Sequence, residues 1–134
     1  MFSAMLLVIS ITALTQFALY YWRAVLAGTA AQPVSDLVFA AAGMGDNRVT
    51  ARDFGTLAGL HELTPSLKSG TGGLGLVRLY YRTVEALGWL AGSRLPAVAA
   101  WTEREGTICA RYAAVLIDRR LQASMALAAS LRNC

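Results

Sequence analysis

Residues 1–22, MFSAMLLVISITALTQFALYYW, contain no charged side chain, and Arg23 follows them directly. An α-helix rises about 1.5 Å per residue, so this stretch would be about 33 Å long, which matches the hydrocarbon core of a bilayer. We therefore predict one membrane-spanning helix. The competing interpretation is a cleaved signal peptide, with residues 27–31, AGTAA, as the cleavage site. No basic residue precedes the apolar run, so a retained helix is favoured.

An aromatic and cationic collar closes this stretch, formed by Tyr20, Tyr21, Trp22 and Arg23. Tyrosine and tryptophan rings favour the headgroup region, and an arginine guanidinium reaches lipid phosphate. These four are the predicted membrane-interface residues. Every basic side chain lies after the span, which under the positive-inside rule predicts that the larger C-terminal part is cytoplasmic.

Three polar residues inside the span, Thr12, Thr15 and Gln16, share one helical face. The Gln16 amide would prefer a hydrogen-bond partner to acyl chains, and a neighbouring transmembrane helix could supply one. The alternative is that the amide is satisfied locally or by water. These residues are therefore candidate partner-helix contacts.

The chain of 134 residues has room for one span and one modest extramembrane unit. Hydrophobic residues make up 56% and the mean hydropathy is +0.48, so the part outside the span is apolar as well. Such a part favours helices that bury surface against one another, a partner or lipid. The net charge is +4, but the basic residues are scattered among acidic ones, so we expect no nucleic-acid partner.

The remaining pattern is helical, and it predicts an all-α fold with an anchor at 1–28 and an α-helical extramembrane region at 29–134. Ser35 can cap a brief helix that Gly43 and Gly45 end, and Thr50 with Asp53 resembles a capping box. Further helices are expected over 51–64, over 74–91, and over about 96–131, the last being threefold longer than average. The apolar stripe expected for the second of these comprises Leu76, Val77, Tyr80, Val84, Leu87 and Leu90 or Ala91.

A ridge of small residues lies on the long last helix, where Gly106, Ala110 and Ala114 recur at four-residue spacing. Such a ridge lets another backbone approach closely, so these three are also candidate partner-helix contacts. The cluster at 118–120, Asp-Arg-Arg, could bind lipid phosphate or a partner's acid, or form a solvated helix face.

Residues suited to catalysis or metal binding are few. His61 lacks a cysteine or carboxylate at metal spacing, Cys109 fits an apolar helical pattern, and Cys134 is expected to be a free thiol. The glycines at 70, 72 and 75 match G-x-G-x-x-G, but the preceding LHELTPSLK is not a strand, which that nucleotide-binding motif requires. We expect neither a cofactor nor a metal.

These features favour a small single-pass accessory subunit of a multi-subunit membrane complex, which stabilises assembly through helix packing. Its expected partners are other membrane protein subunits and the bilayer. Size and location prompt the further hypothesis that the complex is energy-transducing, such as an electron-transfer assembly. The alternative is a self-associating membrane-anchored scaffold, a homo-oligomer. A third hypothesis, a membrane-tethered enzyme using His61, Glu62 or the glycine loop, is disfavoured, and we expect no enzyme.

Overall fold

The computed structural model describes residues 1–64 and 72–134 and is helical throughout, with no strand in the described residues. This confirms the all-α prediction, including the long last helix. The elements in chain order are α1 (Phe2–Ala30), α2 (Asp36–Ala42), the 3-10 turn η1 (Ala51–Asp53), α3 (Phe54–Leu63), α4 (Gly72–Ala91) and α5 (Pro96–Arg132).

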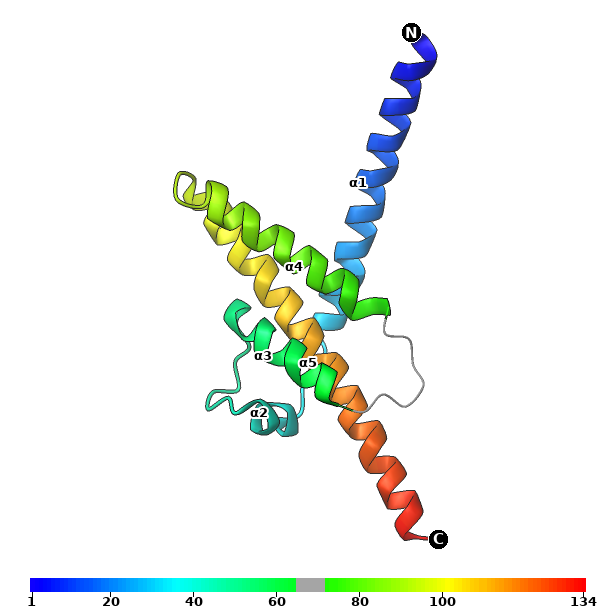
Figure 1. Cartoon of the computed structure of the whole chain (residues 1–134), viewed down its shortest axis with the longest axis vertical. Helices are drawn as coiled ribbons and strands as arrows, with labels where there is room; N and C mark the ends of the chain where they lie inside the picture. The colour runs from blue at the N-terminus through cyan, green and yellow to red at the C-terminus, as the bar shows by residue number, and fades with distance from the viewer. Residues whose placement is uncertain (65–71) are drawn as a thin grey trace.

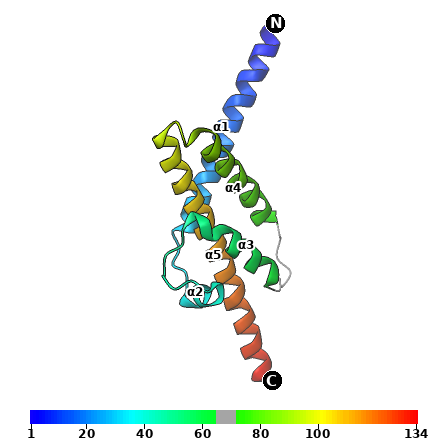
Figure 2. The same ribbon diagram turned by 60° about the vertical axis from the view of Figure 1, so that its left-hand side comes forward.

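Helix α5 is the axis of the molecule, and every other element packs against it (Figure 1). Helix α4 lies along its first part, η1 and α3 contact its middle, and the last turns of α1 and the short α2 complete the bundle. The first part of α1 and the last part of α5 project from opposite ends of this bundle, as Figure 2 also shows.

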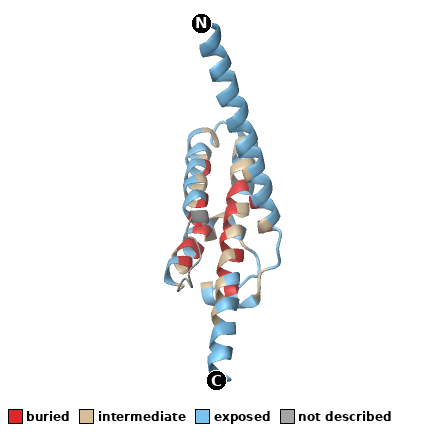
Figure 3. Cartoon of the chain, turned by 90° about the vertical axis from the view of Figure 1, so that its right-hand side faces the viewer, coloured by how far each residue is buried: buried red, intermediate tan, exposed pale blue. Residues whose placement is uncertain are grey.

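The projecting part of α1 is not covered by the other described residues. Residues 1–21 are all exposed, whereas Leu26 and Ala30, near the C-terminal end of the helix, are buried in the bundle (Figure 3). Within the described residues α1 is the one helix long and apolar enough to cross a membrane, and none of its most apolar stretch is buried. A helix with this exposure in water would be unfavourable, because every apolar side chain would be hydrated.

Local signals set most of the helix boundaries. Gly43 ends α2 with a φ of 70°, in the left-handed region that glycine adopts without steric cost. Asp53 accepts hydrogen bonds from the backbone N–H of Thr50 at 2.8 Å and from its hydroxyl at 2.7 Å, so the capping box is confirmed. The first turn after this box is a 3-10 turn, and the α-helix begins at Phe54.

The core lies where α5 meets α3 and α4. Small residues of α5 allow the other helices to come close, and larger side chains of α3 and α4 fill the space. The fully or nearly fully buried members are Phe54, Leu57 and Ala58 of α3, Leu74 and Val77 of α4, and Cys109, Ala110, Ala113, Ala114 and Ile117 of α5.

The prediction that the apolar residues of α4 form one stripe is wrong. They form two faces, one buried and one exposed. Val77 and Val84 are buried against the bundle. The side chains of Leu76, Leu87 and Leu90 are exposed. Helix α4 therefore carries an outward apolar face in addition to its core face.

Candidate functional site at the foot of α1

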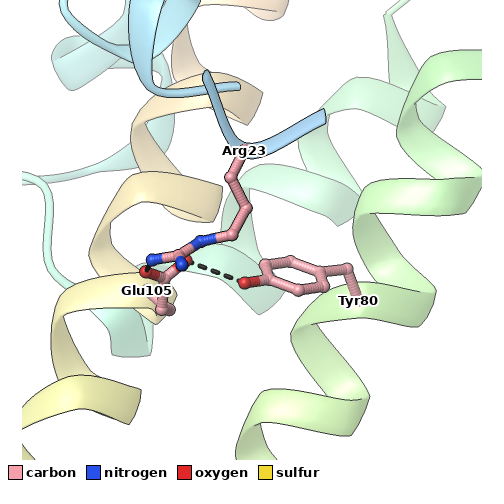
Figure 4. A network of polar contacts seen from close by, with 3 residues as sticks. All are labelled: Arg23, Tyr80 and Glu105. Atoms are coloured by element: carbon pink, nitrogen blue, oxygen red, sulfur yellow. Dashed lines mark hydrogen bonds and ion pairs between the residues drawn. The ribbon is translucent and has the colours of Figure 1, made fainter. Parts of the chain in front are cut away.

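A polar contact joins three helices at the C-terminal part of α1, residues 22–30, here called the foot of α1. The guanidinium of Arg23 in α1 is ion-paired with the carboxylate of Glu105 in α5, and the hydroxyl of Tyr80 in α4 donates to the same carboxylate at 2.8 Å. Figure 4 shows these side chains converging between their helices. The Glu105 side chain is 2% exposed, so its charge depends on these two partners for solvation.

The ring of Trp101 lies near this contact. The guanidinium carbon of Arg23 lies 6.0 Å from the ring centroid of Trp101, at the outer limit of a cation–π contact. Burial, reinforced by the hydrogen bond to Glu105, raises the pKa of Tyr80 well above its usual range, so the hydroxyl remains a donor at neutral pH. The foot of α1 is thereby joined to the bundle by a charged and hydrogen-bonded junction.

The four predicted membrane-interface residues have different surroundings. Tyr20 and Tyr21 are exposed, and Trp22 is half-buried against the core cluster. Arg23 was expected to reach lipid phosphate, but its guanidinium is bound to Glu105 instead. The sequence pattern gave no sign that α5 brings a buried carboxylate to Arg23, since that depends on how α1 crosses α5.

The polar residues inside the apolar stretch lie on exposed surface. The hydroxyls of Thr12 and Thr15 donate to the carbonyls of Val8 and Ile11, at 2.8 and 2.7 Å. These threonines are therefore satisfied within their own helix and do not need a partner helix for hydrogen bonding. Gln16 is exposed on the same helix.

The small-residue ridge of α5 is covered by the chain's own elements, which corrects the expectation that it meets a partner helix. Gly106, Ala110 and Ala114 are buried. A Cβ added at Gly106 would lie 2.7 Å from the Cβ of Ala51, so the glycine is what allows η1 to approach. The close backbone approach that the ridge implied does occur, but within one chain.

The Asp-Arg-Arg cluster of α5 also serves the fold. Asp118 is buried and accepts hydrogen bonds from the hydroxyl of Ser35 and from the amide of Gln122, the latter at 3.1 Å. Arg119 donates to the side-chain oxygen of Gln32 at 2.7 Å. These contacts hold the segment between α1 and α2 against α5. Because the Ser35 hydroxyl donates to Asp118, it makes no capping hydrogen bond to α2.

Arg120 binds the C-terminal end of α3, where helix carbonyls lack internal partners. Its guanidinium donates to the carbonyl of His61 at 3.2 Å. The His61 side chain is buried, and burial together with the charges of Arg120 and Arg78 lowers its pKa. A neutral imidazole in this position is a structural residue of the bundle.

An apolar groove of about 550 Å³ runs between α1 and α4. It begins beside Trp22 and Tyr80, next to the junction, and opens outward along both helices. Its lining residues are Leu14, Thr15, Ala18, Leu19, Trp22, Leu76, Leu79, Tyr80 and Thr83. The hydroxyls of Thr15, Tyr80 and Thr83 donate to acceptors of the chain itself, and the rest of the lining is apolar, so the groove fits hydrocarbon.

The described residues hold no arrangement suited to metal chemistry, since no three histidine, cysteine or acidic side chains lie together in residues 1–64 and 72–134. Cys109 is buried, and burial raises the pKa of its thiol to about 12, so it is not a nucleophile at neutral pH. The first glycine of the G-x-G-x-x-G match, at position 70, lies outside the described residues.

The sequence did not point to Glu105 or Tyr80 as members of the junction. The available signal was Glu105 itself, because it lies four residues after Trp101 and four before Cys109 on an otherwise apolar face. An acid on such a face requires a cation, and Arg23 is the one basic residue at the foot of α1. No protein-family model, curated protein or solved structure matches this chain.

Proposed function

We propose that this chain is a small single-pass accessory subunit of a membrane protein complex, anchored by α1 and contributing a rigid helical unit at one membrane surface. The observation that carries this proposal is the exposed apolar stretch of α1. Its residues up to Tyr21 are uncovered by the chain, and their length matches a bilayer core. Lipid and neighbouring transmembrane helices are the surroundings that such a surface requires.

The junction at Arg23 and Glu105 supports a structural role. A tether that only restricts diffusion can be joined to its cargo by a flexible linker. Here the last turns of α1 enter the core through Leu26 and Ala30, and the ion pair binds the same helix to α5. Anchor and bundle are therefore one continuous body, which fixes the orientation of the bundle relative to α1.

The projecting end of α5, residues 121–132, supports a protein partner at the other end of the molecule. Met125, Leu127 and Leu131 are exposed there, on a stretch whose one charged side chain is Arg132. An apolar helix that extends beyond its own bundle fits a helix of a second subunit. The basic residues that follow α1 lead us to propose that this end is cytoplasmic.

Native mass spectrometry after extraction in mild detergent tests the proposal. We expect the chain in a complex of fixed stoichiometry with different membrane proteins, and we expect a Met125→Asp, Leu131→Asp double variant to lose them. Ala40→Asp, which places a charge on an exposed site of α2, is the control and should retain the complex. A pure homo-oligomer would contradict the accessory role and support a self-associating scaffold.

A further inference from the structure

The hairpin tip, residues 86–102, joins the end of α4 to the start of α5 and carries one charged side chain, Arg94. Glu85 precedes it and Glu103 follows it, and these two acids line the same surface depression between α4 and α5. The charged surfaces of both helices therefore end at the same level. Beyond that level the surface is uncharged apart from Arg94.

The packing of the tip is the reverse of what a helix pair in water shows. Small residues face inward: a Cβ at Gly88 would lie 3.0 Å from the Thr102 hydroxyl, and one at Gly92 would lie 3.6 Å from the Cβ of Ala99. Large residues face outward, with Trp89 83% exposed. Helices in water bury their large apolar residues, whereas helices in lipid pack through small ones.

The outward apolar residues cover the exposed sides of the tip. Leu90 is 70% exposed and lies on a different face of α4 from Trp89, and Leu87 and Leu95 are exposed as well. Trp89 lies on the same face of α4 as Arg78 and Arg82, so this face is charged in the preceding turns and apolar in the tip. Helix α4 therefore changes from amphipathic to apolar on its exposed faces where the tip begins.

Three backbone donors of the turn are satisfied within the tip. The N–H of Gly92 donates to the carbonyl of Gly88 at 2.9 Å, and those of Arg94 and Leu95 donate to the carbonyl of Ala91 at 3.1 and 2.9 Å. Internal satisfaction of backbone groups is what a lipid environment requires, because lipid offers them no partners.

The tip and the apolar part of α1 lie toward the same end of the molecule. In all three views the tip points toward the same end of the molecule as the N-terminal part of α1, and it lies level with the middle of that helix (Figures 1, 2 and 3). The apolar groove connects the two surfaces, because Leu76 and Leu79 line it and continue along α4 toward Leu87 and Leu90.

We propose that the hairpin tip inserts into the leaflet that surrounds the C-terminal half of the α1 span, as a second contact between the bundle and the bilayer. Pro96–Thr102 extends about 10 Å, which matches the depth reached by interfacial helices. Trp89, at the base of the tip, lies at the level of the headgroups and the first acyl carbons, and the Arg94 side chain at the turn extends back toward the headgroups. This inference rests on the proposed anchoring by α1, and it fixes the tilt of the bundle, which one helix alone leaves free.

Spin labels in the full-length chain test the insertion. Three variants carry a single added cysteine at an exposed site, Phe17→Cys in α1, Leu90→Cys in the tip and Leu131→Cys in the projecting end of α5, all with Cys134→Ser. The native Cys109 is buried and stays unlabelled. Each protein is reconstituted in vesicles of phosphatidylcholine and phosphatidylglycerol, and collision of the label with oxygen and with a water-soluble nickel chelate is measured.

We expect the ratio of oxygen to nickel collisions at position 90 to be several-fold higher than at position 131, and the ratio at position 17 to be highest. A label at position 90 that matches position 131 while position 17 remains lipid-like would overturn the insertion and leave the anchor intact. A label at position 90 shielded from both reagents would also overturn it, because protein would then cover the tip. A water-accessible label at position 17 would overturn the anchor and the insertion together.

Discussion

The guanidinium of Arg23 is ion-paired with the carboxylate of Glu105, although 82 positions separate them in the chain. The two side chains differ in their surroundings, because that of Arg23 is 49% exposed and that of Glu105 is 2% exposed. An ion pair with this asymmetry depends on its exposed member: without the arginine, a carboxylate is left buried, whereas without the acid, an arginine can turn to water or to headgroups.

Substitution of the two partners should therefore have unequal effects. We expect Arg23→Gln to lower the free energy of unfolding by about 3 kcal/mol, because Glu105 keeps only the Tyr80 hydroxyl as a partner. Glu105→Gln should cost about 1 kcal/mol, since a neutral amide is less expensive to bury. Chemical unfolding in mild detergent, followed by tryptophan fluorescence, measures both. Equal losses, or a larger loss for Glu105→Gln, would contradict this account of the junction.

Gly106 should tolerate no side chain. Gly106→Ala places a methyl group against Ala51 and should destabilise the bundle by about 1–3 kcal/mol through overpacking. Gly59→Ala is the matched control, because Gly59 lies in α3 and a Cβ there would meet nothing within 4 Å. It should stabilise the fold by about 0.5–1 kcal/mol through helix propensity. Two variants with the same sign of effect would refute the assigned contact with η1.

His61 should make the fold less stable in acid. Its pKa is lowered in the folded chain, first by burial and then by Arg120 and Arg78, so below about pH 6.5 the unfolded chain binds a proton that the folded chain resists. The contribution of His61 to stability is thus complete above that pH and is lost as the pH falls through the folded pKa. Unfolding measured from pH 8 to pH 5 should show this loss, and His61→Gln should flatten it. An unchanged pH profile in the variant would argue against the buried imidazole.

The two thiols should differ in reactivity. Cys109 is buried with its pKa raised to about 12, whereas Cys134 is exposed. At neutral pH in detergent we expect a maleimide to label one thiol per chain rapidly and the second only after denaturation. Cys134→Ser should abolish the rapid phase. Rapid labelling of two thiols in the native protein would show that the core around Cys109 is open.

Local patterns in the sequence were sufficient to predict much of the fold. The length and apolarity of residues 1–22 predicted an uninterrupted helix, the Thr50 and Asp53 pair predicted the cap that precedes α3, and Pro96 predicted the start of the long helix. Each of these signals acts over a few residues, so neighbours in the chain are enough to recognise it.

Tertiary pairing could not be predicted in this way. The spacing of Gly106, Ala110 and Ala114 indicated close backbone approach, but periodicity does not say whose backbone comes close. At Gly106 it is that of η1. For Arg23, lipid phosphate and a buried acid are both suitable partners, and the choice depends on how α1 crosses α5. The sequence likewise does not show which apolar residues of α4 are buried and which are exposed, because that depends on where α5 packs.

Sedimentation of membranes washed in alkaline carbonate tests the central claim that α1 holds this chain in a bilayer. We predict that the chain remains in the membrane pellet after the wash and enters solution only with detergent, and that Leu7→Asp combined with Leu14→Asp within the exposed stretch of α1 releases it. Recovery of the unaltered chain as a monomer in the detergent-free supernatant would contradict the claim.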